Sequence, residues 1–168
     1  VLLRNGVPAP LLSGGARMSE VVNAVQQRLE TPRLVVDLRR LGLTFGDVAI
    51  PLQKQLLAFY VWMLRAQGEP RPAWKRAIPG ALAEISTEYD RMPKRDVFDD
   101  EVRVITGDAR LAELKGRTNR AIERALRATR VGMWLDLLLV QSGGRRNATT
   151  YSIGLDPGLV TIIESEYA

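Results

Sequence analysis

The stretch "LLAFYVWML", Leu56 to Leu64, is the feature that most constrains the fold of this chain. It lies in an expected helix over 52–67 whose apolar residues occupy several sides rather than one. A helix that is apolar all round is stable only when other elements bury it. Crossing a membrane would need roughly 20 apolar residues, which this run does not approach. The pattern therefore predicts a central core helix and no membrane segment.

Other segments carry their own secondary-structure signals. Short β-branched and leucine-rich runs, broken at Leu41-Gly42 and Gly46-Asp47, predict a small antiparallel sheet over 34–50. Helical spacing predicts further helices over 80–92 and 108–129. The rest is expected as a loop over 68–74, a linker over 93–103, a hairpin over 134–155 with "LDLLLV" in its first strand, and a last strand, "LVTIIE".

The order of sheet, three helices and basic-tipped hairpin predicts an α+β fold, a winged helix-turn-helix with a small N-terminal antiparallel sheet. Valines at helical spacing after Ser19, ended by Thr31-Pro32, predict a short helical connector in front. We expect two parts: residues 1–32, the tail of an upstream domain with the connector, and residues 33–168, the winged helix. The Pro- and Gly-rich start without an initiator Met favours a piece whose upstream partner has been removed, and N-terminal processing is the alternative explanation.

The chain contains no cysteine and no histidine. This excludes disulfides, the usual zinc sites, cysteine nucleophiles and histidine general bases. We therefore expect no catalytic residues, no cofactor and no enzyme activity. The carboxylates Asp99, Asp100 and Glu101 are adjacent, so they point in different directions, and a solvated linker is a better interpretation than a metal site. With 24 Lys+Arg against 19 Asp+Glu and a pI near 10.0, the composition favours an anionic partner.

Basic residues dominate the expected helix over 108–129. On a helical wheel, Leu114, Thr118 and Ile122 share one side, and the opposite side holds four arginines, Arg117, Arg120, Arg124 and Arg127. A solvated face with i,i+4 pairs, such as Glu113 with Arg117 or Glu123 with Arg127, is the alternative interpretation. The exclusive use of arginine favours contacts with phosphate and guanine instead.

The hairpin tip, "SGGRRNATTY", adds two arginines and an asparagine next in sequence to this helix, so both are expected to form one basic surface. The alternative is an ordinary polar turn. The predicted nucleic-acid-binding residues are Lys115, Arg117, Asn119, Arg120, Arg124, Arg127, Arg145, Arg146 and Asn147.

Two segments resemble the OmpR-type winged helix. "LVVDLRRLGLTFGDVAIPLQKQLLAFYVWMLRAQGEP" is similar to its opening, and "TNRAIERALRATR" followed by "TTYSIGL" is similar to its recognition helix and wing. Pro51 stands where that family has a capping threonine. The start, "VLLRNGVPAPLLSGG", with "SEVVNAVQQRLE" and "PRLVVDL", resembles the join between sensor domain and winged helix in CRISPR-associated CARF proteins of the ring-nuclease type.

The second resemblance implies a cytoplasmic antiviral sensor whose upstream CARF domain binds, and often cleaves, cyclic oligoadenylate. It also implies a homodimer. The CARF ligand-binding motifs are absent from this sequence, so no ring-nuclease residue is assigned. The nucleic acid is expected to be DNA rather than RNA. Two alternatives stay open: an interaction and dimerisation module that touches no nucleic acid, and the output domain of a transcription regulator with a phosphoacceptor receiver upstream.

Overall fold

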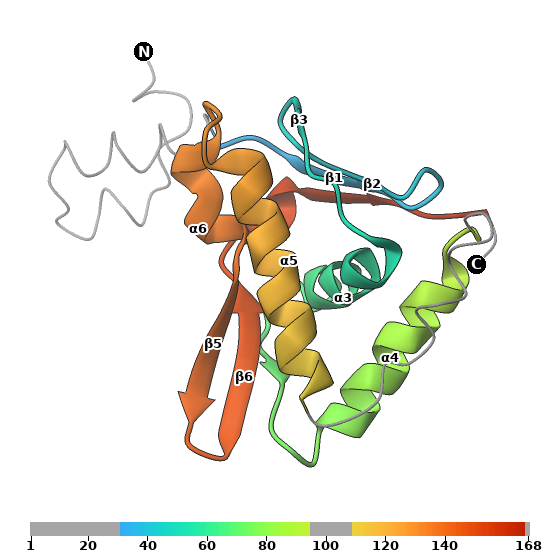
Figure 1. The fold of residues 1–168 in the computed structure, drawn as a ribbon, viewed down its shortest axis with the longest axis vertical. Coiled ribbons are helices and arrows are strands. Elements are labelled where there is room, and N and C mark those ends of the chain that lie inside the picture. The colour runs from blue at the N-terminus through green and yellow to red at the C-terminus, as the bar shows by residue number, and fades with distance from the viewer. Residues whose placement is uncertain (1–30, 95–108, 167–168) are drawn as a thin grey trace, which may run out of the picture. The chain divides into compact units, whose positions relative to one another are not determined.

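The structure is a computed structural model that describes residues 31–94 and 109–166 (Figure 1). The chain divides into two units, Val1–Pro32 and Arg33–Ala168, and the elements described below belong to the second. The connector helix expected over 19–30 and most of the expected linker lie outside the described residues. Among the described helices, none is both long enough and apolar enough to span a membrane.

Helix α3, Lys54–Leu64, is the central core helix, as its sequence predicts. All of its 11 residues are buried, including Lys54, whose ammonium lies 4.1 Å from the centre of the Tyr89 ring. Helices α4, Ile78–Arg91, and α5, Arg110–Leu126, both pack on α3 (Figure 1). Because apolar residues occupy all sides of α3, each of these contacts removes apolar surface from water.

The first sheet has the strand order β3-β2-β1-β7. Strand β1, Leu34–Asp37, pairs antiparallel with β2, Gly42–Phe45, which pairs antiparallel with β3, Val48–Ala49. These three strands confirm the small sheet expected over 34–50. Strand β7, Val160–Ile163, joins the other side of β1 in parallel. The sequence predicts that strand but not its partner, because parallel strands are joined by long connections that local patterns do not encode.

The second sheet has the strand order β4-β6-β5. Strands β5, Val140–Arg145, and β6, Ala148–Ile153, form a hairpin. Strand β4, Arg71–Pro72, pairs antiparallel with β6. The expectation of a plain loop over 68–74 is therefore wrong at these two residues. A strand this short leaves no alternating pattern, and only its pairing with β6 defines it.

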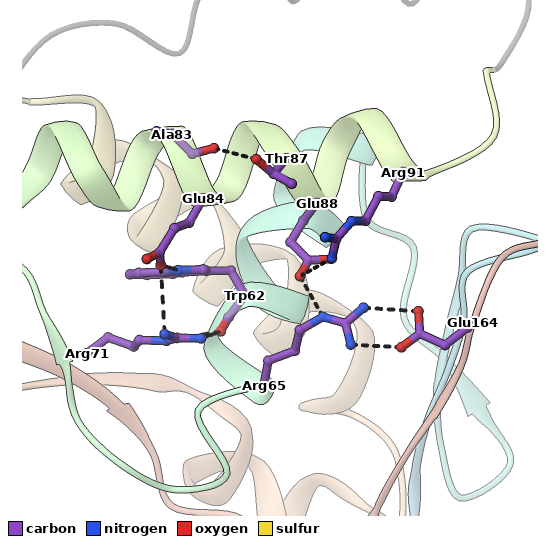
Figure 2. A network of polar contacts seen from close by, with 9 residues as sticks. All are labelled: Trp62, Arg65, Arg71, Ala83, Glu84, Thr87, Glu88, Arg91 and Glu164. Atoms are coloured by element: carbon purple, nitrogen blue, oxygen red, sulfur yellow. Dashed lines mark hydrogen bonds and ion pairs between the residues drawn. The ribbon is translucent and has the colours of Figure 1, made fainter. Parts of the chain in front are cut away.

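Contacts of Trp62 with Arg71 and with Glu84 connect β4 to α3 and α3 to α4 (Figure 2). Arg71 donates a hydrogen bond from Nη2 to the backbone carbonyl oxygen of Trp62 at 2.8 Å, and its guanidinium lies 4.8 Å from the centre of the indole ring. The indole N–H of Trp62 donates to Glu84 of α4 at 2.6 Å. Strand β4, and the hairpin paired with it, are thereby attached to α3 and α4.

Arg65, directly after α3, connects α4 to the segment that follows β7 (Figure 2). Its Nε lies 2.6 Å from Glu88 Oε1, and its two terminal nitrogens donate to the carboxylate of Glu164 at 2.7 and 3.1 Å. Hydrogen bonding from Arg65 lowers the pKa of Glu164. The far end of β7 is thus held by an ion pair to the core helix.

Helical turns, rather than a strand, precede the hairpin. The segment η2, Gly132–Trp134, is a 3-10 helix, and α6, Leu135–Leu138, is one α-helical turn. The expectation that "LDLLLV" is a strand is therefore wrong except at Val140. A short leucine run fits either structure by pattern alone, and leucine lacks the β-branch that favours strands. A second 3-10 turn, η3, Pro157–Leu159, precedes β7, and the whole architecture is mixed α+β.

Candidate nucleic-acid interface

Helix α5 presents an apolar face to the core and a basic face to solvent. Arg120, Arg124 and Arg127 are exposed, which confirms the predicted orientation of the helix. Its buried residues recur at helical spacing and are Leu111, Leu114, Thr118, Ile122 and Leu126.

Two of the four predicted arginines have intramolecular partners. Arg117 donates to Gln53 Oε1 at 2.7 Å and lies 3.7 Å from Glu113. Arg127 lies 3.3 Å from Glu123. The i,i+4 pairs of the solvated-face alternative are therefore present. Exposed ion pairs of this kind typically contribute about 0–1 kcal/mol, so a phosphate can displace them.

The other two arginines lack a polar partner within the part of the chain that the structure describes. Arg120 and Arg124 are exposed and have no hydrogen bond or ion pair with any residue that the structure describes. They are four residues apart, so they follow one another along the same side of α5. Their guanidinium groups are therefore accessible from solvent.

Lys115 and Asn119 are half-buried and contact the hairpin. Asn119 donates to the carbonyl oxygen of Val140 at 3.0 Å and accepts from the N–H of the same residue at 2.8 Å. Lys115 donates to Ser142 Oγ at 2.6 Å, and its ammonium lies 5.3 Å from the centre of the Tyr151 ring. Both polar groups therefore attach the hairpin to α5. A role for Lys115 and Asn119 in binding nucleic acid stays a prediction.

The hairpin tip is exposed and basic. Arg145, Arg146 and Asn147 are all exposed, and their side chains have no hydrogen bond or ion pair with the described part of the chain. Asn147 has φ +67° and Gly144 has φ +85°. Both values lie in the left-handed region, which asparagine and glycine adopt most readily. A Cβ atom at Gly144 would also collide with the carbonyl oxygen of Ala148.

The hairpin tip and the exposed arginines of α5 extend in opposite directions from the contacts that join the hairpin to the helix. Because Asn119 contacts Val140 and Lys115 contacts Ser142, the hairpin runs back along α5 toward its beginning. From Ser142 the tip continues about 10 Å in that direction. From Lys115 the exposed arginines extend about 8 to 18 Å in the opposite direction. Lys115 and Arg117 lie between the two groups along α5, so the expectation of a single basic surface stays a prediction.

Two further exposed cations, Lys75 and Arg76, are not among the binding residues predicted from the sequence. They occupy the turn between β4 and α4, at the end of the molecule where the hairpin tip lies. The one signal in the sequence is the basic pair itself, in a segment expected to be a plain loop. Only the pairing of β4 with β6 relates them to the tip.

The acidic cluster Asp99, Asp100 and Glu101 lies outside the described residues. Within residues 31–94 and 109–166, no three His, Cys, Asp or Glu side chains gather where they could hold a metal ion. Comparisons of the chain with known protein families, with curated proteins and with solved structures find no match.

Proposed function

We propose that the described unit is a winged helix-turn-helix that binds duplex DNA. The order of its elements supports this proposal: α3, the short strand β4, α4, α5 and the hairpin follow one another, and β4 pairs with the hairpin. Helix α5 is then the recognition helix and the hairpin is the wing. The observation that carries the proposal is the pair Arg120 and Arg124, which are exposed, one helical turn apart and without a polar partner among the described residues.

In this proposal α5 lies against the major groove, where arginine binds phosphate or the O6 and N7 atoms of guanine. The hairpin tip lies farther along the duplex, and Arg145 and Arg146 bind its backbone. Asn119 and Lys115 set the angle between helix and hairpin through their contacts with β5. B-form DNA is favoured because its major groove admits a helix, whereas the major groove of A-form RNA is too narrow for side chains to read.

The test is a salt titration of binding to a labelled duplex. Removing one protein–phosphate interaction flattens the plot of log K against log salt by about 0.9. The double variant Arg120→Ala with Arg124→Ala should therefore flatten the slope by about 1.8. The control is Arg39→Ala with Arg40→Ala, which removes the same charge from the turn between β1 and β2. Absence of wild-type binding at low salt would disprove the proposal, and tighter binding to duplex RNA would disprove the assignment to DNA.

One observation favours the interaction module as a second candidate. Met133 is 76% exposed and is the one large hydrophobic residue so exposed in the described part of the chain. Its neighbours Trp134, Leu135 and Leu137 are only half-buried. If this surface mediates self-association, Met133→Lys should lower the molar mass measured by sedimentation, whereas binding to DNA should be unchanged.

The sequence resemblance extends the proposal to the protein's context. We propose that the winged helix is the C-terminal module of a cytoplasmic, homodimeric CRISPR-associated CARF sensor. The support is the resemblance of residues 1–15, 19–30 and 32–38 to the join seen in that family. The coding sequence upstream of Val1 tests it directly. A Rossmann-like domain is expected there, and a phosphoacceptor receiver domain would favour the transcription-regulator alternative instead.

A further inference from the structure

The turn between β4 and α4 presents two cations that do not belong to the basic face of α5. Lys75 and Arg76 are exposed, and neither has a hydrogen bond or ion pair to another described residue. The turn is closed by a hydrogen bond from the Ala77 N–H to the Trp74 carbonyl oxygen at 2.8 Å, and α4 begins immediately afterwards. The backbone of the turn is therefore fixed, and its two cationic side chains are open to solvent.

The second sheet brings this turn to the hairpin tip. The N–H of Ala73 donates to the carbonyl oxygen of Thr149 at 2.8 Å, and Thr149 pairs with Gly144 across the hairpin. Lys75 follows Ala73 by two residues, which is about 7 Å of chain at most. Four cations from segments far apart in the sequence therefore gather at one end of the sheet: Lys75, Arg76, Arg145 and Arg146. We call them the hairpin-end cluster.

No carboxylate accompanies the hairpin-end cluster in these two segments. Residues 73–77 and 144–149 contain four basic residues and no Asp or Glu. On α5, by contrast, Glu113 and Glu123 lie beside the arginines and pair with two of them. Unpaired like charges on one surface create a positive potential that attracts polyanions. Within these two segments, therefore, no carboxylate competes with phosphate for the four cations.

We infer that the hairpin-end cluster is a phosphate-binding surface in which Lys75 and Arg76 bind the same DNA backbone as the hairpin tip. This inference rests on the proposed DNA binding. From the contacts of β5 with α5, the cluster extends in the direction opposite to Arg120 and Arg124. It therefore contacts phosphates on a different stretch of the duplex from those bound by Arg120 and Arg124.

The experiment compares three double variants in the salt titration. Lys75→Ala with Arg76→Ala tests the turn, Arg145→Ala with Arg146→Ala tests the tip, and Arg39→Ala with Arg40→Ala is the charge-matched control from a turn in the first sheet. Circular dichroism and thermal melting verify that each variant keeps the fold, which is expected because these side chains are exposed.

The turn and tip variants should each flatten the slope of log K against log salt by about 1.8, the value for two phosphate contacts, and the control should leave it unchanged. The combined four-residue variant should flatten it by about 3.6. If the turn variant has the slope of the control while wild-type protein and tip variant differ, the inference is wrong although DNA binding stands. If wild-type protein does not bind DNA at all, the proposed function itself fails.

Discussion

A substitution at Thr118 tests the packing around α5. Most core substitutions lower the free energy of unfolding, whereas this one is expected to raise it. The residue is 0% exposed, and its hydroxyl has no hydrogen-bond partner among the described residues. Mutational data put the cost of burying such a group at about 1–3 kcal/mol. Thr118→Val replaces the hydroxyl by a methyl group of similar shape, and the two residues have similar helix propensities. The variant should therefore be more stable by about 1–2 kcal/mol.

A matched control is available at Thr129, just after α5. Its hydroxyl donates to the carbonyl oxygen of Leu126 at 2.7 Å. The same chemical change, Thr129→Val, removes this hydrogen bond and should destabilise the protein by about 0.5–1.5 kcal/mol. The two substitutions thus have opposite expected signs because only one hydroxyl has a partner.

Thermal and urea unfolding of both variants would measure the difference. For a chain of this size, a gain of about 1–2 kcal/mol corresponds to a rise in melting temperature of about 2–8 °C. The proposed binding to DNA should not change, since Thr118 is fully buried. A loss of stability in Thr118→Val would refute the reasoning, because it would mean that the hydroxyl is hydrogen-bonded.

Other changes probe the core, the ion pair and the hairpin. Leu57→Ala, at a residue 0% exposed in α3, should cost about 2–5 kcal/mol in urea unfolding, and a midpoint equal to wild type would show that α3 is not central. Arg65 lowers the pKa of Glu164, so the pair stabilises the fold above the usual carboxyl pKa, and this stabilisation is lost as pH falls through the lowered value. Glu164→Gln should therefore reduce the melting temperature at about pH 7 more than at about pH 3, and equal reductions would contradict the pairing. Gly144→Ala should lower the melting temperature by more than Gly143→Ala, since only Gly144 has a positive φ; similar losses would contradict the turn geometry.

The basic face of α5 shows which features of a helix can be predicted from residue spacing alone. The wheel of α5 predicts which residues are buried and which arginines are exposed, because both follow from the helical repeat. It cannot predict that Asn119 and Lys115 bind the hairpin. Those contacts depend on the residue at which β5 begins. Because residues 132–138 form helical turns, β5 begins only at Val140.

The sequence itself determined three features, because each follows from the spacing of neighbouring residues. They are the burial of α3, the antiparallel pairing of β1 to β3 and the orientation of α5. Tertiary structure alone decided the pairing of β4 with β6 and of β7 with β1. It also decided that Lys75 and Arg76 lie near Arg145 and Arg146 rather than on the face of α5. The physical reason is that hydrogen bonding between distant strands depends on the packing of the whole core, which no local pattern contains.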